Sequence, residues 1–272
     1  MDRTGLRSRL IALTSRLGLF RPAAFLRRSL TTAGRQTNAQ LRQHEADMVS
    51  LYRHFVQSGD LCFDIGANNG NRVEVFLRLG ANVVAVEPQP ACVDYLHARY
   101  GHRAAVHIVA AGLDAQPGQA DLFIGSNKTM SSMSADWIAH IKTRDARHAA
   151  RTWTERITVP VTTLDALIER FGVPRFVKID VEGFEYQIIS GLSRPLAAVS
   201  IEYTPEHLDP AFQSIRRLND LGSYEFNYAV GETMQLILPE WVDPHQMEAT
   251  LRDLAATHQS GDIYARLKPS SP

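Results

Sequence analysis

Acidic side chains and glycines gather at a few points of this chain, and their spacing suggests a small-molecule site. Asp64 stands near the end of the short apolar run 62–65 and precedes a turn bounded by Gly66 and Gly70. Glycine-rich turns after buried strands usually bind the phosphates of nucleotide cofactors. A carboxylate beside such a turn would repel a pyrophosphate, so it favours a ligand that carries positive charge.

A second acid, Glu87, ends the next apolar run and follows Asp64 by 23 residues. An acid at about this spacing typically binds the ribose hydroxyls of a nucleoside cofactor. S-adenosylmethionine offers a ribose, an ammonium and a sulfonium but no phosphate, so it matches both acids. Small residues 110–112 after a third apolar run leave room for its adenine. The expected cofactor-binding residues are Asp64, Gly66, Ala67, Asn68, Asn69, Gly70, Glu87, Ala111 and Asp180.

Charged residues cluster again in the stretch "VKIDVEGFE", where another apolar run ends. Methyl transfer to a hydroxyl needs the acceptor oxygen held in line, and a general base helps because an alcohol is a weak nucleophile. We expect Asp180 to contact the methionine portion or the acceptor, and Glu182 or His207 to take the proton. Lys178 is expected to keep Asp180 ionised. The expected acceptor-binding residues are Lys178, Glu202, Ser131 and Ser132.

We expect no metal at this site. Magnesium among Asp180, Glu182 and Glu202 is kept as a minor alternative, because oxygen ligands suit that ion. Zinc is excluded because Cys62 and Cys92 have no histidine or cysteine at ligand spacing.

Apolar runs that alternate with helical patterns must position these residues. Strands that are apolar along their whole length are buried on both faces, and their alternation with helices predicts a doubly wound, mostly parallel sheet. Such sheets bind ligands beyond the carboxyl ends of their strands. Helices are predicted before Gly59, before Gly80 and from Thr163 to Gly172. The C-terminal runs "SYEFNYAV", "MQLILPE" and "DIYARL" predict strands in an antiparallel edge or hairpin.

Composition places the chain among ordinary globular proteins. It has 272 residues, a formal net charge of zero and two cysteines, which favours a cytoplasmic location and gives no global attraction to nucleic acid. Residues 1–44 nevertheless hold nine arginines and one acid. We therefore predict a basic amphipathic extension over residues 1–42 that could contact a membrane surface peripherally. A domain over residues 43–268 follows, with a lid-like insertion at 126–156.

Several motifs together resemble the FkbM-type methyltransferases. They are "FDIGANNG", "VVAVEPQP", "VTTLDALIERFGVPRFVKIDVEGFE", "SIEYTPEH" and "GDIYA", in that order from about residue 45 to residue 267. The resemblance implies S-adenosylmethionine-dependent O-methylation of sugars, polyketides or other hydroxylated metabolites. It also implies a Rossmann-like class I methyltransferase fold, with a seven-stranded sheet whose last strand is antiparallel.

Three other functions compete with this interpretation. An NAD-dependent oxidoreductase would need the G-x-G-x-x-G turn, which is absent. A nucleic-acid methyltransferase would need a basic stripe on the domain, and only the extension is basic. A non-catalytic protein that binds a nucleoside cofactor would have no use for clustered acids in a crevice. The preferred acceptor is therefore a hydroxyl of a small molecule or glycan.

Overall fold

The computed structural model describes residues 32–126, 130–144 and 151–269. Its main element is a seven-stranded sheet in the order β3-β2-β1-β7-β8-β10-β9. All strands are parallel except β10, which runs antiparallel to both β8 and β9. The strands are β1 (Leu61–Ile65), β2 (Asn82–Val86), β3 (Val106–Val109), β7 (Phe176–Ile179), β8 (Ala198–Tyr203), β9 (Tyr224–Val230) and β10 (Gly261–Leu267).

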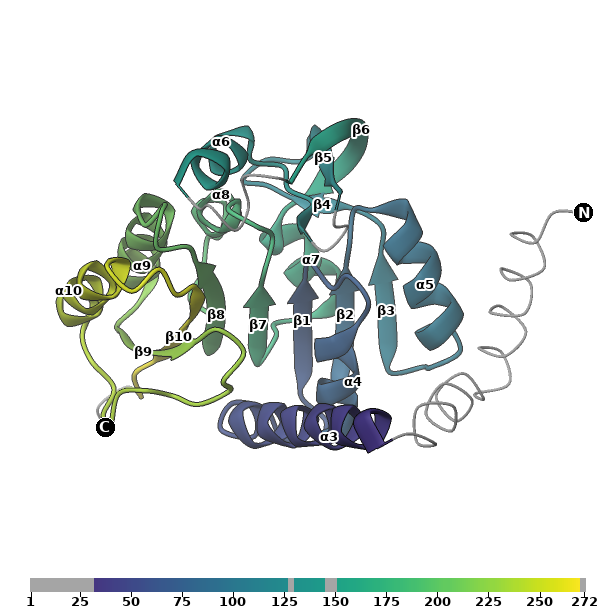
Figure 1. Cartoon of the computed structure of the whole chain (residues 1–272), viewed down its shortest axis with the longest axis horizontal. Helices are drawn as coiled ribbons and strands as arrows, with labels where there is room; N and C mark the ends of the chain where they lie inside the picture. Colours follow the sequence, from purple (N-terminus) through teal and green to yellow (C-terminus); the bar gives the residue numbers. More distant parts are fainter. Residues whose placement is uncertain (1–31, 127–129, 145–150, 270–272) are drawn as a thin grey trace, which may run out of the picture.

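Helices cover both faces of this sheet, as the alternating pattern predicts (Figure 1). One face carries α3 (Thr32–Tyr52), α4 (Asn71–Arg78) and α5 (Pro90–Tyr100). The other carries α7 (Leu164–Phe171), α8 (Glu185–Ser190), α9 (Asp209–Leu221) and α10 (Pro244–Ala255). The limits of α7 agree with prediction, because the hydroxyl of Thr163 accepts the amide N–H of Ala166 and Gly172 follows the last turn.

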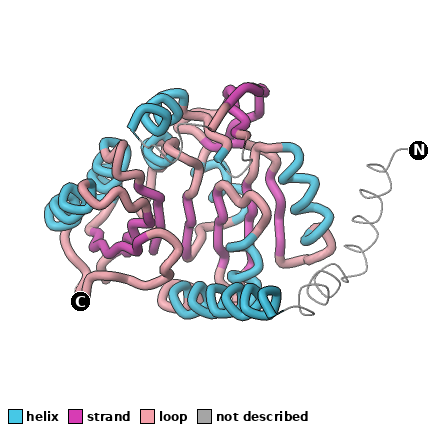
Figure 2. The backbone as a smooth tube through the Cα atoms, viewed as in Figure 1, coloured by secondary structure: helices cyan, strands magenta, loops and turns pink. Residues whose placement is uncertain are grey.

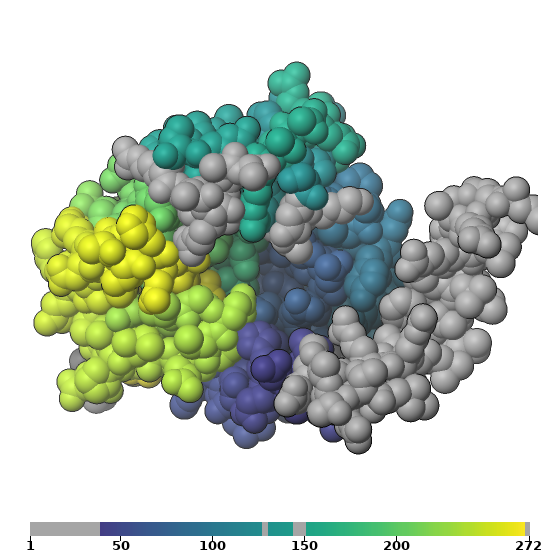
Figure 3. All heavy atoms as spheres, in the orientation of Figure 1, coloured from purple at the N-terminus to yellow at the C-terminus, as the bar shows by residue number. Residues whose placement is uncertain are grey.

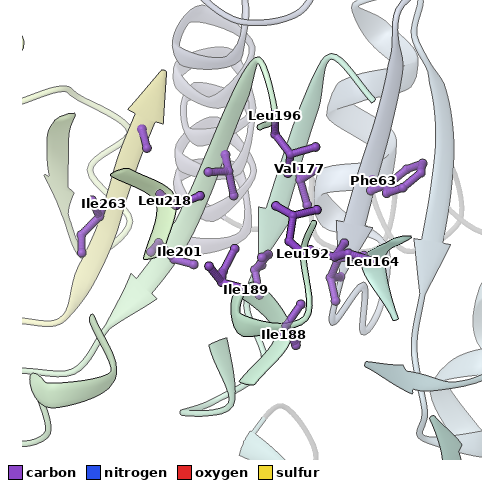
Figure 4. Close-up of a cluster of buried hydrophobic side chains, with 14 of the residues drawn as sticks. Phe63, Leu164, Val177, Ile188, Ile189, Leu192, Leu196, Ile201, Leu218 and Ile263 are labelled. Carbon is purple, nitrogen blue, oxygen red and sulfur yellow. The ribbon is translucent and has the colours of Figure 1, made fainter. Parts of the chain in front are cut away.

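The larger hydrophobic core lies between the sheet and α7 to α10. Phe63, Val177, Ile201 and Ile263 project from four strands into this layer, where they meet side chains from the helices and the loops that follow them (Figure 4). Leu164, Ile188, Ile189, Leu192, Leu196 and Leu218 are the opposing residues labelled there. Burial on both faces explains why these strands are mostly apolar, and Asp64, Lys178 and Asp262 are buried charged exceptions within them.

A second, three-stranded sheet lies beyond the carboxyl ends of β1, β2, β3 and β7 (Figure 1). It has the order β4-β6-β5, formed by β4 (Gly112–Leu113), β5 (Gly118–Gly125) and β6 (Trp153–Thr162). Helix α6 (Ala135–Arg144) lies between β5 and β6 in the sequence. The expected insertion at 126–156 therefore contains a helix and part of this small sheet, and its closing role stays a prediction.

The predicted antiparallel pairing at the C-terminal edge is confirmed, because the last strand, β10, lies antiparallel between β8 and the edge strand β9. The C-terminal region differs from the sequence prediction in one way. The segment "MQLILPE" forms a loop, because the side-chain amide of Asn227 replaces the ladder of a strand. Its Nδ2 donates to the carbonyl of Leu238 at 2.9 Å, and its Oδ1 accepts the amide of Leu238 at 3.0 Å.

Helix α3, the first described element, lies apart from the small sheet (Figure 1). Helix α3 runs along the lower ends of the strands, opposite the small sheet (Figures 1 and 2). The helix begins before the predicted boundary at residue 43, so residues 32–42 of the predicted extension belong to α3, and residues 1–31 lie outside the described residues. In the space-filling view of Figure 3, α6 and the small sheet form the upper rim of the described surface. Among the described residues, no helix has the length and hydropathy needed to cross a bilayer.

Candidate functional site

The glycine turn after β1 is held closed by its own backbone amides. The amides of Gly66 and Ala67 both donate to the carbonyl of Val86, at 2.9 and 3.0 Å. The amide of Asn68 donates to a carboxylate oxygen of Glu87 at 2.8 Å. These three N–H groups already donate hydrogen bonds within the protein, so they are not available to bind a phosphate group.

Gly66 is required by a close approach between two strand ends. It has a φ of 82°, and an added Cβ would lie 1.9 Å from the carbonyl oxygen of Asp180. The amide of Asp180 also donates to the carbonyl of Ile65 at 3.0 Å. The absence of a side chain at Gly66 therefore lets the ends of β1 and β7 meet.

Glu87 is fixed in orientation by two backbone donors. Its Oε2 accepts the amide of Asn68, and its Oε1 accepts the amide of Gln89 at 2.8 Å. The side chain is buried, and burial raises its pKa although these donors oppose the rise. Each oxygen keeps a second lone pair, so the carboxylate can still accept ribose hydroxyls.

Asp64 is a buried acid with an unmet oxygen. The residue is 2% exposed, and its Oδ2 has no hydrogen-bond partner among the described residues. Burial raises the pKa of Asp64 to about 7, although Arg72 and Lys178 lower it. An unpaired buried carboxylate is costly, so this oxygen calls for a donor or a cation from a ligand.

These residues line a cavity of about 310 Å³ at the carboxyl edge of the sheet. The cavity contains most of the expected cofactor residues and several of the expected acceptor residues. The predicted site residues among its lining are Asp64, Gly66, Ala67, Asn68, Asn69, Glu87, Ala111, Ser131, Asp180, Glu182 and Glu202. Gly70 is set back from it, with its carbonyl accepting the hydroxyl of Tyr100 at 2.9 Å.

Three acids at the ends of β7 and β8 converge in this cavity. One carboxylate oxygen each from Asp180, Glu182 and Glu202 lies within 4.8 Å of the other two. Burial raises the pKa of Glu182 and of Glu202 well above the ordinary value, and their neighbouring acids raise both further. The raised pKa values favour the protonated forms of Glu182 and Glu202, so this pair can exchange protons with a ligand.

A strained turn places Glu182. Strand β7 ends at Ile179, and Glu182 has a φ of 57°, a backbone conformation that residues other than glycine rarely adopt. The carboxylate of Glu185 holds the turn by accepting the amides of Val181 and Gly183, at 3.2 and 3.1 Å. The predicted alternation of strand residues therefore does not extend to Glu182, whose position depends on this turn.

The segment around α6 braces the same turn from above. The hydroxyl of Ser132 donates to the carbonyl of Glu182 at 2.6 Å. Trp137, which is 1% exposed, leaves no room for a Cβ on Gly183, and its indole nitrogen donates to Thr204 at 3.2 Å. The α6 segment therefore connects the loops that follow β7 and β8.

Two of the expected acceptor-binding residues, Lys178 and Ser132, are not among the residues that line the cavity. Lys178 is 1% exposed, and its ammonium lies 2.7 Å from Asp262 and 3.3 Å from Asp180. It pairs with both acids, so the expected role in keeping Asp180 ionised and the expected contact with the acceptor stay predictions. Ser132 is likewise buried and supports Glu182. Ser131 does line the cavity, where its hydroxyl donates to Gln89 at 2.8 Å.

His207 lies outside the residues that line this cavity. Its ring stacks on His140 of α6, with centroids 4.3 Å apart, and its Nε2 lies 3.4 Å from Asp136. Strand β8 ends at Tyr203, and the turn that follows directs His207 toward α6. The structure therefore places His207 in contact with α6, and its expected role in taking the proton stays a prediction.

The cavity also has lining residues that the sequence interpretation missed. Arg72 and Glu232 meet at its rim, with Nη2 of Arg72 donating to both Glu232 oxygens at 2.9 and 3.1 Å. Met133 lines it from the segment before α6. A signal for Arg72 was present in the sequence, since it follows the glycine turn by two residues. No local pattern indicated Glu232.

Comparison with known proteins agrees with this geometry. Residues 64–228 match the model of the methyltransferase FkbM domain, which is more than half of the chain. The chain belongs to the FkbM methyltransferase family. The predicted fold class, enzyme class and S-adenosylmethionine cofactor are thereby confirmed for this domain. The match includes the glycine turn, the acid Glu87 and the converging carboxylates.

One curated relative is the hexuronic acid methyltransferase AglP of Haloferax volcanii, which is 28% identical over 171 residues. The alignment covers 61% of this chain and 64% of that protein, which is less than two thirds of the relative's length.

Solved structures resemble the chain only distantly. A precorrin-6Y C5,15-methyltransferase from Geobacter metallireducens has a TM-score of 0.44 at 13% identity, covering 82% of this chain and 87% of its own. A SAM-dependent O-methyltransferase from Thermotoga maritima has a TM-score of 0.39 at 11% identity, covering 84% and 66%. The strand order of the sheet itself is what defines the fold.

The residues of this chain suit that cofactor. The unmet oxygen of Asp64 can receive the ammonium group, and the oriented carboxylate of Glu87 can receive ribose hydroxyls. Small residues, Ala111 and Gly112, line the cavity beside them and leave space for a flat ring. The closed backbone of the glycine turn agrees with a cofactor that has no phosphate.

Proposed function

We propose that this protein transfers a methyl group from S-adenosylmethionine to a hydroxyl group of a sugar or a similar hydroxylated acceptor. The observation that supports the proposal most directly is the convergence of Asp180, Glu182 and Glu202 in the cavity that also contains Asp64 and Glu87. One part of this cavity suits a nucleoside with a positive charge. The other part offers carboxylates to an incoming hydroxyl.

In this mechanism the cofactor, when bound, supplies an electrophilic methyl group on a sulfonium. Asp64 and Glu87 would hold this cofactor, and the methyl group would pass to an acceptor oxygen held in line by the acids after β7 and β8, leaving S-adenosylhomocysteine as the product. Glu182, with Glu202 beside it, takes the hydroxyl proton, which suits carboxyl groups whose pKa values are raised. Asp180 is held by Lys178 at 3.3 Å and orients the acceptor or the ammonium group.

The charge of the cavity points to an acceptor without a carboxylate of its own. Three acids line the acceptor part, and the only cationic side chain among the described lining residues is Arg72, which Glu232 already pairs. A hexuronate, the class named for the Haloferax relative, would bring a further negative charge beside Glu182 and Glu202, whose pKa values show that ionisation is already unfavourable there. We therefore propose a neutral or amine-bearing sugar, with polyketide and other hydroxylated metabolites as related acceptors.

Calorimetry and a turnover assay together test this function. S-adenosylhomocysteine should bind the purified protein, and NADH should not. Formation of S-adenosylhomocysteine should then be measured with matched hexosides and hexuronates as acceptors. We expect at least about tenfold higher kcat/KM for the neutral partner, since one unfavourable charge contact is worth about 1.4 kcal/mol or more. Binding without turnover on any acceptor would instead support a non-catalytic cofactor-binding protein.

A metal among the three acids is the remaining alternative for the mechanism. Magnesium would lower the pKa of the acceptor hydroxyl, so that a chelator would abolish turnover. The proposal expects turnover to continue in the presence of a strong chelator.

Two proposals concern segments outside the site. The basic extension over residues 1–42 is proposed to contact anionic membranes peripherally. The full chain should then pellet with anionic liposomes, and a variant that lacks residues 1–31 should not. Unchanged pelleting would exclude the proposal.

The α6 segment of the insertion is proposed to act as a lid over the acceptor, since it braces the turn that carries Glu182.

A further inference from the structure

Arg72 occupies an unusual position for an arginine. It is the second residue of α4 and follows Gly70, the last residue of the glycine turn, by two positions. Its side chain is 12% exposed and lines the cavity, where it is the only cation among the described lining residues. A guanidinium that is largely buried beside a ligand cavity normally meets an anion, because its five N–H donors fit a carboxylate.

The donors of Arg72 are only partly used by the protein itself. Nη1 contacts the sulfur of Met48 at 3.2 Å, which is a weak acceptor, and Nε is buried without a hydrogen-bond partner among the described residues. Nη2 alone donates to a carboxylate, that of Glu232. An unpartnered buried N–H is unfavourable, so the guanidinium is set up for a better acceptor than the protein provides.

Glu232 is suited to be a replaceable partner. It follows Gly231 in the turn after β9, and its side chain is 62% exposed. Because the Glu232 side of the pair is exposed, its carboxylate is readily hydrated when released, so losing this contact costs little on the Glu232 side. Exchanging Glu232 for another carboxylate on Arg72 therefore keeps the local charge balance at a small cost.

The cofactor carries both an ammonium and a carboxylate on its methionine portion. The acids that line the cavity would repel that carboxylate, so Arg72 is the position where it can be bound. We propose that Arg72 binds the α-carboxylate of the cofactor, and that Glu232 is an internal competitor which holds Arg72 until the cofactor displaces it. This inference rests on the proposed cofactor function and assigns a role to two residues outside the predicted site.

The test compares two ligands by calorimetry on the full chain. S-adenosylhomocysteine carries the α-carboxylate, whereas 5′-methylthioadenosine has the same nucleoside and lacks the amino-acid portion. Arg72→Gln should weaken binding of the first by about thirtyfold or more, the usual effect of losing a buried charge partner, and leave the second unchanged. Arg78→Gln is the matched control, because Arg78 lies on the same helix and pairs with Glu45 and Glu74.

Glu232→Gln provides the second measurement and avoids any folding defect at Arg72. Removing the competing charge should tighten S-adenosylhomocysteine binding about two- to fivefold, because the exposed Glu232 carboxylate is a weak competitor, without affecting methylthioadenosine. Equal affinity of the wild type and Arg72→Gln for S-adenosylhomocysteine would overturn the role of Arg72. Unchanged or weaker binding by Glu232→Gln would overturn the competition. If the wild type binds neither ligand, the cofactor function itself fails.

Discussion

Replacing Lys178 by methionine is expected to destabilise this protein by about 3–5 kcal/mol, the usual cost of leaving one buried charge without its partner. The ammonium of Lys178 lies 2.7 Å from Asp262, and both side chains are buried. Burial lowers the pKa of Lys178, but Asp180 and Asp262 together raise it well above its ordinary value, so the lysine is charged. The Coulomb attraction between Lys178 and Asp262 at 2.7 Å is about 6 kcal/mol at an effective dielectric constant of 20.

The two acids that contact Lys178 should respond differently. Asp262 has a side-chain exposure of 8% and would remain buried and uncompensated, with the hydroxyl of Tyr264 3.4 Å away as its remaining donor. The side chain of Asp180 is 38% exposed and can be hydrated, so losing its contact with Lys178 adds only about 0–1 kcal/mol to the destabilisation. Most of the destabilisation should therefore come from Asp262.

Urea unfolding monitored by circular dichroism measures the loss in free energy of unfolding. In thermal unfolding of a domain of this size, the same loss corresponds to a fall in Tm of about 10 °C. Lys178→Met combined with Asp262→Asn should recover most of the loss, because no buried charge then remains. The double variant should still have low methyl-transfer activity, since Asp180 loses its oriented partner. If the single variant is as stable as the wild type, or the double variant is the less stable one, the reasoning about this pair is wrong.

Three further predictions concern the cofactor part of the site and the base. Burial raises the pKa of Asp64 to about 7 from an unfolded value near 4, so the stability that this group contributes to the free protein should be lost as pH rises from about 4 through 7. Binding of S-adenosylhomocysteine should strengthen over the same range with release of a proton, which calorimetry in buffers of different ionisation enthalpy detects; the absence of proton release would contradict this. Gly66→Ala should cost at least about 1–3 kcal/mol in urea unfolding and should abolish cofactor binding, because the Cβ would overlap the carbonyl of Asp180; a variant with normal affinity would disprove the close approach. Glu182→Gln should lower kcat by about 10²–10⁴-fold with unchanged S-adenosylhomocysteine affinity, and full turnover would show that Glu182 is not the base.

Local sequence was enough to predict the strands and turns that carry the cofactor residues. β1, β2 and β7 are short and apolar because both of their faces are buried, and this makes them visible without any tertiary information. Asp64 and Glu87 follow from their positions at strand ends. The same reasoning failed for "MQLILPE", whose apolar residues resemble a strand although the amide of Asn227 determines its path.

The small sheet and the docking of α6 were outside the reach of such reasoning. The pairing of β5 with β6 joins segments on either side of an insertion, and its register depends on packing instead of on a short turn. His207 illustrates the consequence. Its place after a strand suggested a contact with the acceptor, whereas its stacking on His140 depends on where the insertion returns to the domain.

The sequence by itself determined the order of the strands along the chain, the glycine turn and the acids that follow it, because spacing and burial are local properties. Only the tertiary structure decided which charges meet. Lys178 pairs with Asp262 across 84 residues, and Arg72 pairs with Glu232 across 160. Such contacts form only after distant segments are brought together, and their energies depend on burial that no local pattern records.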